Sequence, residues 1–164
     1  LAELCARWPA PAALQLEGQC ELLLARDGRY LVHEIRTFPA GIAAALGDLR
    51  PLGRTLSVCF RPYPFTLPAR LDELVAVLAT ADRVLLLPPY PGASVHGAPS
   101  PRSPASEVAT DAVPVDRQLA QRLADRALCL DDAPERELGR AFAAGHLLLV
   151  GGDDVRGLAS TLTP

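Results

Sequence analysis

The sequence predicts a single α/β domain in which helices cover both faces of a mostly parallel sheet. The main evidence comes from residues 53–92, which read as a strand, a helix and a second strand. Leu56, Val58 and Phe60 occupy alternate positions, which predicts a short, largely buried strand. The continuous apolar run from Val84 to Leu87 is typical of a strand that is buried on both faces. A crossover helix between two such strands gives the parallel βαβ unit.

Length and composition fit this class. A chain of 164 residues is one domain by the usual expectation, and it is long enough to bury about 70% of the surface that the unfolded chain exposes. Hydrophobic residues make up 49% of the sequence and charged residues 21%, which is ordinary for a globular α/β domain. The chain therefore has the material for a core of its own.

The elements that precede the central unit are a lead-in, a hairpin and a helix. We expect residues 1–19 to be a lead-in from a preceding segment and residues 20–164 to form the domain, and the absence of an initiator Met suggests a fragment. Two strand candidates, Glu21 to Ala25 and Tyr30 to Ile35, flank Asp27-Gly28, a strong hairpin signal. A helix that ends before Pro51 follows, with Ile42, Leu46 and Leu49 on its inward side.

The helix of the central unit is predicted by apolar spacing. The residues at positions i, i+3, i+4 and i+7 of this segment are Leu71, Leu74, Val75 and Leu78. Asp72 and Glu73 lie in its first turn, where the helix dipole favours acidic side chains. Ligand sites in such sheets lie beyond the carboxyl ends of the strands, which here means the turn from Arg61 to Pro68 and the loop that begins at Pro88.

The remainder of the chain alternates loop, helix and strand. Residues 88–114 are rich in Pro, Ser and Gly and predict a long surface loop, with 92–112 as its most mobile part and one short helix near Ser103-Pro104. The elements expected after it are a helix at Asp116 to Arg126, a strand at Ala127 to Leu130, a helix that carries Leu138 and Phe142, a strand at His146 to Val150, and a final helix with Val155, Leu158 and Leu162 inward.

Charge and composition exclude several classes of function. The net charge is −3 and the basic residues are scattered, so the electrostatic footprint of a nucleic-acid binder is absent. No apolar run approaches the roughly 20 residues that span a bilayer, and no signal peptide begins the chain, so we expect a cytoplasmic location without a membrane partner. All 16 basic residues are Arg, which excludes a P-loop lysine and a lysine Schiff base. The cysteines lack metal-site spacing and are expected to pack as small hydrophobes.

Two motifs need weighing against ordinary structural roles. His33-Glu34 opens like the zinc motif H-E-x-x-H, but Thr37 stands at its fifth position, so the zinc interpretation fails. Gly151-Gly152-Asp153-Asp154 follows a strand and opens a helix, where backbone amides bind phosphate. Two consecutive carboxylates argue against an anion there without a metal, and a plain Asp N-cap is the favoured alternative.

Four motifs in order resemble the C-terminal domain of the Mur ligases, with the UDP-N-acetylmuramate:L-alanine ligases as the nearest branch. Phe60 to Thr66 stands where that family has F-Q-P-H-R-Y-S/T, and Glu34 to Pro39 falls on D-Y-A-H-H-P. The segment from Ala81-Asp82 to Tyr90-Pro91-Gly92 resembles A-D, an apolar strand and Y-P-A-G, and Gly151 to Val155 falls on G-A-G-D-I. The resemblance covers essentially the whole chain and implies a Rossmann-like three-layer domain with a mostly parallel sheet of about six strands and an antiparallel edge hairpin.

The resemblance implies a function in peptidoglycan synthesis. Enzymes of this family join an amino acid to a UDP-linked muramoyl precursor through an acyl phosphate formed with ATP, and their C-terminal domain closes over a central ATPase domain. Several positions depart from the family pattern. Thr37 and Phe38 replace two histidines, and Tyr63-Pro64 replaces His-Arg. Because proline cannot replace a guanidinium that binds a carboxylate, either Arg61 and Arg70 have taken over or the domain no longer serves catalysis directly.

Two hypotheses follow. The first is the C-terminal domain of a divergent Mur ligase, inactive alone, and the second is a degenerate Mur-like binding or scaffolding module. The resemblance implies no catalytic residue and no metal site in this chain, Mg-ATP as the cofactor of a full-length parent, and a central ATPase domain or an equivalent protein as the partner. The candidate residues for binding substrate or nucleotide are Glu34, Arg61, Tyr63, Arg70 and Asp154.

Overall fold

The computed structural model describes residues 20–63, 70–89, 113–131 and 133–162, and these form an α/β fold around one six-stranded sheet. The strands are β1 (Cys20–Arg26), β2 (Arg29–Glu34), β3 (Thr55–Phe60), β4 (Arg83–Leu86), β5 (Ala127–Cys129) and β6 (Gly145–Val150). The helices are α2 (Pro39–Leu49), α3 (Leu71–Leu78), α4 (Val115–Leu123), α5 (Pro134–Ala144) and α6 (Asp153–Gly157). Short 3₁₀ helices are η1 (Arg50–Leu52), η2 (Ala124–Arg126) and η3 (Leu158–Leu162).

The sheet is mostly parallel with an antiparallel pair at one edge, as predicted. The strand order is β1-β2-β6-β3-β4-β5, and only the β1–β2 pair runs antiparallel. In the middle of the sheet Val58 is level with Val84 on one side and with Leu148 on the other. The last strand of the chain therefore lies between the second and the third, which local sequence patterns do not reveal.

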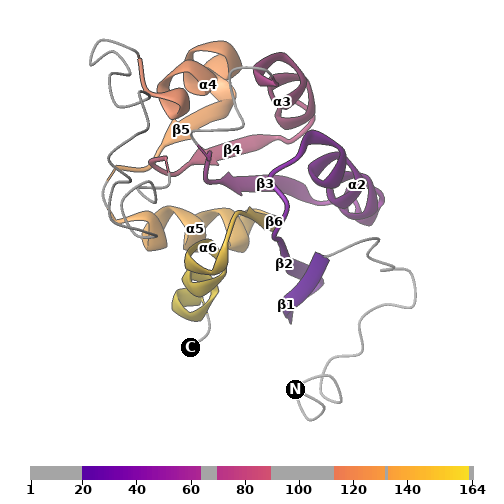
Figure 1. Cartoon of the computed structure of the whole chain (residues 1–164). Helices are drawn as coiled ribbons and strands as arrows, with labels where there is room; N and C mark the ends of the chain where they lie inside the picture. Colours follow the sequence, from indigo (N-terminus) through magenta and orange to yellow (C-terminus); the bar gives the residue numbers. More distant parts are fainter. Residues whose placement is uncertain (1–19, 64–69, 90–112, 132, 163–164) are drawn as a thin grey trace, which may run out of the picture.

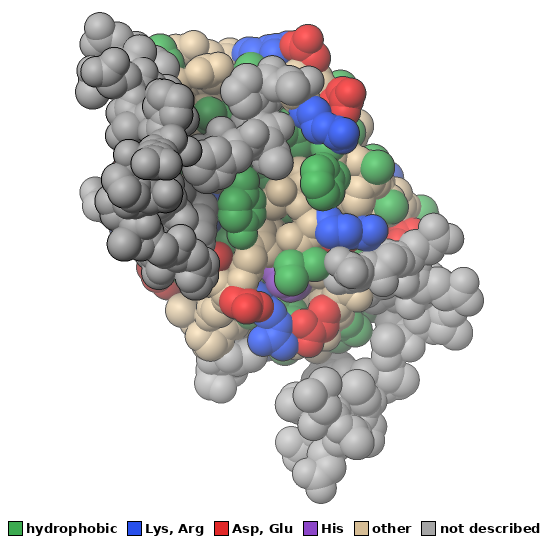
Figure 2. Space-filling model, in the orientation of Figure 1, with side chains coloured by type: hydrophobic (Ala, Val, Ile, Leu, Met, Phe, Trp, Pro, Cys, Tyr) green, Lys and Arg blue, Asp and Glu red, His purple; other side chains and the backbone are tan. Residues whose placement is uncertain are grey.

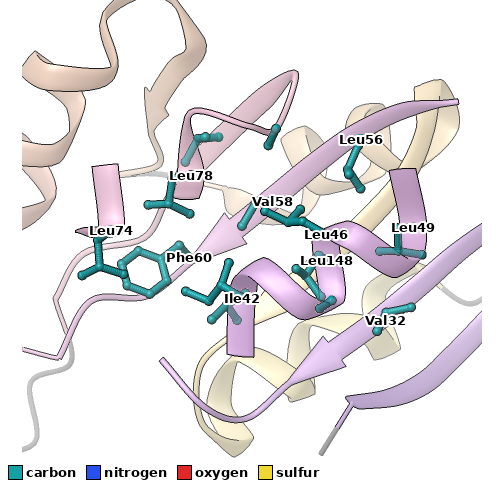
Figure 3. Close-up of a cluster of buried hydrophobic side chains, with 14 of the residues drawn as sticks. Val32, Ile42, Leu46, Leu49, Leu56, Val58, Phe60, Leu74, Leu78 and Leu148 are labelled. Carbon is teal, nitrogen blue, oxygen red and sulfur yellow. The ribbon is translucent and has the colours of Figure 1, made fainter. Parts of the chain in front are cut away.

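Helices cover the sheet on both faces and complete a three-layer fold. Helices α2, α3 and α4 lie on one face, above the sheet in Figure 1, and α5 and α6 lie on the other. Each layer has its own core. Figure 3 shows the first, in which Ile42, Leu46 and Leu49 of α2 pack against alternate residues of the neighbouring strands.

Strand alternation decides which core each side chain enters. Leu56, Val58 and Phe60 are fully buried on the α2 side, and Cys59 is buried on the α5 side. Burial of each large side chain contributes about 1.5 to 3 kcal/mol relative to exposure. The central strands thus contribute side chains to both cores.

Local signals explain most element boundaries. The hairpin turns at Asp27 and Gly28, whose φ angles of 53° and 71° are left-handed, a conformation that Gly adopts readily and that Asp tolerates. After η1, Gly53 also takes a left-handed conformation, with φ of 75°, which ends the helical segment. Pro134 occupies the first turn of α5, where its missing N–H costs no hydrogen bond.

Three predictions fall outside the described residues: the lead-in at 1–19, the mobility of 92–112 and the short helix near Ser103-Pro104. Among the residues that are described, no helix combines the length and the apolar character needed to cross a membrane.

Candidate functional site

The carboxyl ends of three adjacent strands meet at one edge of the sheet. Glu34 ends β2 and is level with Val150, the last residue of β6, which is also level with Phe60 at the end of β3. Two backbone hydrogen bonds extend this order past the strands: Gly151 N donates to Glu34 O at 3.1 Å, and Arg61 N donates to Val150 O at 3.1 Å. This is the edge at which open α/β sheets bind ligands.

Arg61 and Asp154 form an ion pair at this edge. The distance from Arg61 Nη1 to Asp154 Oδ2 is 3.0 Å, and the two side chains are 21% and 36% exposed. Asp154 lies in the first turn of α6, where the helix dipole favours a carboxylate. Within the described residues Arg61 Nε is buried and has no hydrogen-bond partner. The guanidinium is therefore anchored by Asp154, and only the exposed 21% of the side chain is accessible to an additional anionic group.

Two glycines make the turn between β6 and α6 compact enough to reach Arg61. Gly151 has φ of 152°, and a Cβ there would lie 2.6 Å from Val155 Cγ2. A Cβ on Gly152 would lie 2.9 Å from the Tyr63 hydroxyl and 3.2 Å from Asp154 Oδ1. Tyr63, Gly152 and Asp154 are thus immediate neighbours, and three of the five candidate residues gather here.

The N-cap interpretation of this turn was wrong. The N-cap of α6 is Gly152, and no side chain makes a capping hydrogen bond there. Asp153 and Asp154 are the first two helical residues and follow the N-cap by one and two positions, and Asp154 pairs with Arg61 instead.

Glu34 is enclosed on the opposite face of the sheet. Strand alternation places it with Tyr30 and Val32 on the α2 side, whereas Arg61 continues from Phe60 toward the α6 side. Its carboxylate has no exposed surface and accepts hydrogen bonds from Arg36 N at 2.8 Å, Arg36 Nε at 2.9 Å, Arg36 Nη2 at 3.1 Å and Cys20 Sγ at 3.1 Å. Burial acts to raise the pKa of Glu34, but these hydrogen bonds outweigh it and hold the pKa below its usual value. The carboxylate is fully occupied by its own chain.

Sequence reasoning missed the partners of Glu34. Arg36 stands two residues after Glu34, a spacing at which side chains of an extended segment share a side, and this was the available signal. Cys20 could not be found in this way, because only the hairpin register brings it opposite Glu34. Burial, followed by the contact with Glu34, raises the pKa of the Cys20 thiol to about 12, so it is not a nucleophile at neutral pH.

Arg70 lies at the start of α3, and its guanidinium contacts the ring of Phe38. Its guanidinium carbon is 5.5 Å from the centre of the Phe38 ring, a cation–π distance, and Glu73 lies 4.0 Å from Arg70 Nη1. Phe38 precedes α2 and is 48% exposed, and nearby Ile35 is 46% exposed. Phe38 is thus a half-exposed ring that the Arg70 guanidinium partly covers.

Other features of the described surface do not coincide with this edge. Figure 2 shows basic, acidic and hydrophobic side chains interspersed over one face, without a large block of one charge. Two hollows of about 230 and 250 Å³ lie elsewhere, between the β1–β2 hairpin and η3, and neither is lined by Arg61, Tyr63 or Asp154. No group of His, Cys, Asp and Glu side chains within the described ranges could hold a metal ion.

Comparison with known proteins supports the fold. No protein-family model matches the chain, and no curated protein matches it. The chain is similar to the crystal structure of a domain from a Haemophilus ducreyi 35000HP protein described as a UDP-N-acetylmuramate:L-alanyl-gamma-D-glutamyl-meso-diaminopimelate ligase. The TM-score is 0.55 and the sequence identity 18%, over 87% of this chain and 94% of that chain. A likeness at this identity shows a shared fold.

Proposed function

We propose that this chain is the C-terminal domain of a divergent Mur ligase, and that it supplies an anion-binding edge to a nucleotide-binding domain. The observation that carries the proposal is the Arg61–Asp154 pair, in which the Arg61 side chain stays partly exposed and Asp154 lies on the turn that resembles the family motif G-A-G-D-I. The fold similarity to a domain of a protein described as a UDP-N-acetylmuramate ligase supports the same conclusion. The parent reaction is the ATP-dependent joining of an amino acid to a UDP-N-acetylmuramate precursor in peptidoglycan synthesis.

The composition of the chain limits which part of the parent reaction this domain supplies. Acyl-phosphate chemistry needs a cradle for the ATP phosphates, a magnesium site and a cation beside the transferred phosphoryl group. The sequence has no Lys, which removes the lysine of a P-loop. Arg61 is suited to the remaining task of contacting a phosphate or carboxylate presented by a partner domain. The isolated chain therefore neither hydrolyses ATP nor ligates an amino acid.

The second candidate is a non-catalytic Mur-like module, and the state of Glu34 favours it. The family's acidic position survives here as a carboxylate occupied by Arg36 and Cys20. A carboxylate in that state cannot accept a hydrogen bond from a ligand without losing an existing one. In this alternative the edge binds a partner protein, with the exposed Ile35 and Phe38 as contacts.

The test of the anion site is an NMR titration of the ¹⁵N-labelled chain. One or two charge-assisted hydrogen bonds of about 1.5 to 3 kcal/mol each, reduced by the entropy cost of association, give a roughly millimolar Kd. Pyrophosphate should therefore shift the amide signals of Arg61, Gly151 and Gly152 with a Kd of about 1 mM or weaker. Arg61→Ala should abolish these shifts, whereas Arg136→Ala, an exposed arginine on α5, should leave them unchanged.

Two outcomes would contradict the proposal. Shifts that persist in Arg61→Ala would remove Arg61 from the site. Micromolar binding of Mg-ATP that Arg61→Ala abolishes would show that the chain needs no partner domain for nucleotide. The sequence of a longer parent protein would distinguish the two candidate functions. A glycine-rich loop that ends in Lys and Ser or Thr supports the ligase, and the absence of such a loop supports the module.

A further inference from the structure

We infer that His33 is a positioning residue of the anion-binding edge: its hydrogen bond to Gly151 fixes the turn that presents Asp154 to Arg61. The inference rests on the proposed function and deepens it. His33 belongs to β2 and does not touch the proposed ligand, so it acts through the turn.

The contact itself is short and buried. His33 Nε2 lies 2.9 Å from Gly151 O, and His33 is only 3% exposed. A carbonyl oxygen can only accept, so His33 Nε2 must carry the hydrogen. The structure thus requires the Nε2–H form of the ring, a property that can be measured directly.

Strand β2 holds Gly151 at both of its peptide groups. Gly151 N donates to Glu34 O at 3.1 Å, and Gly151 O accepts from His33 Nε2. The two bonds come from consecutive residues of β2, so they define both the position and the tilt of Gly151. Gly151 needs this support because its φ of 152° lies in a region where a glycine backbone has wide freedom.

The position of Gly151 affects Arg61 through Asp154, which follows Gly151 by three residues and pairs with Arg61. Gly152 follows Gly151 directly, contacts the Tyr63 region and caps α6, and Asp154 in the first turn of α6 pairs with Arg61 at 3.0 Å. Helix α6 is only five residues long and cannot fix its own start by length. Arg156 anchors its other side to Glu21 through hydrogen bonds of 2.8 and 2.9 Å. His33 therefore controls the end of the helix that faces the site.

A merely structural histidine would behave differently from a positioning one. Loss of a merely structural hydrogen bond lowers the stability of the whole fold without a separate effect on the turn or on pyrophosphate binding. A positioning role requires a donor at the place of Nε2, which Gln provides and Leu does not. His146 offers a matched control, because it is also buried in the sheet but lies at the opposite end of β6.

The experiment uses the full chain labelled with ¹⁵N and four variants: His33→Leu, His33→Gln, His146→Leu and His146→Gln. Long-range ¹H–¹⁵N spectra identify the ring nitrogen of His33 that carries hydrogen. Amide exchange and chemical shifts report the turn from 151 to 154 without ligand, and pyrophosphate titration reports the site. Urea unfolding measures stability in parallel.

We expect the Nε2–H form in the wild-type chain. His33→Leu should speed amide exchange in the turn and weaken pyrophosphate binding about tenfold, the equivalent of one lost hydrogen bond. His33→Gln should restore both to within about twofold of the wild-type values, because its amide can donate as Nε2 does. The His146 variants should lower stability without changing either readout.

The inference is overturned by the Nδ1–H form of His33, by unchanged turn exchange in His33→Leu, or by equal defects in His33→Leu and His33→Gln. A wild-type chain that fails to bind pyrophosphate would refute the proposed anion site alone, because turn exchange in the ligand-free variants still decides the role of His33.

Discussion

Gly152→Ala is the substitution that disturbs the geometry of the site most directly. A Cβ at this position would lie 2.9 Å from the Tyr63 hydroxyl and 3.2 Å from Asp154 Oδ1, whereas ordinary contacts begin at 3.4 Å. The hydroxyl must therefore retreat by about half an ångström, which is the tolerance within which binding groups have to be held. We expect pyrophosphate binding to weaken about tenfold or more, because a misplacement of about 1 Å can cost about a hundredfold.

The fold should tolerate this change. Gly152 has φ of −74° and ψ of −167°, an extended conformation that alanine adopts without strain. The atoms in contact are the far ends of side chains, which can move, so the cost is that of replacing a Gly N-cap by Ala, about 1 kcal/mol or less. The measurement is a pair of experiments on one sample: urea unfolding and pyrophosphate titration.

Gly157→Ala is the matched control. Gly157 is the last residue of α6, and nothing lies within 4 Å of a Cβ built there. Replacing Gly by Ala in a helix stabilises it by about 0.5 to 1 kcal/mol, and pyrophosphate affinity should be unchanged. If Gly152→Ala binds pyrophosphate as well as Gly157→Ala does, the turn is not part of an anion site.

Three further predictions concern stability. Leu86→Ala should lower the free energy of unfolding in urea by about 2 to 5 kcal/mol, because Leu86 is fully buried. Leu128 lies on the adjacent strand and is 39% exposed, so Leu128→Ala should cost far less. A loss below about half a kcal/mol for Leu86→Ala would show that Leu86 is not part of the core. Burial lowers the pKa of His146, whose Nδ1 accepts a hydrogen bond from Tyr30 N, so the folded state binds fewer protons than the unfolded state. The free energy of unfolding should therefore fall as the pH drops below about 6.5. His146→Gln should flatten that part of the pH profile, and an unchanged profile would contradict the assignment. Despite burial, hydrogen bonds lower the pKa of Glu34, so its contribution to folding stability is present above about pH 4.3 and is lost as the pH falls further. Glu34→Gln should lower the free energy of unfolding by about 1 to 3 kcal/mol at pH 7 and by less at acidic pH. Equal stability of the two proteins at pH 7 would refute the ion pair.

The elements of this fold are predictable because their signals are local. Alternation in β3, the Asp27-Gly28 turn and the spacing of Leu119 and Leu123 in α4 each depend on neighbours a few residues apart. The strand order is not predictable in this way. The position of β6 between β2 and β3 depends on packing between residues more than 80 positions apart, for which the sequence has no periodic signature.

The candidate site was predictable only in part, for the same reason. The family resemblance indicates Arg61, Tyr63 and Asp154 as candidates, and the order of β3 and β6 places the three close together. The isolation of Glu34 depends on the hairpin register that places Cys20 opposite it. The sequence singles out His33 only as the start of an incomplete zinc motif, because no sequence pattern links it to a carbonyl 118 residues away.

Strand alternation at one sheet edge separates the candidate residues into two chemical environments. His33 and Glu34 are consecutive, so their side chains emerge on opposite faces: His33 toward α6 and Glu34 toward α2. On the α2 face every acceptor of the carboxylate is engaged by Arg36 and Cys20, which leaves a rigid structural pair. On the α6 face the Arg61 side chain pairs with Asp154 and remains 21% exposed. At this sheet edge the Arg61 side chain on the α6 face is therefore accessible to a further group, whereas the Glu34 carboxylate on the α2 face is already fully hydrogen-bonded.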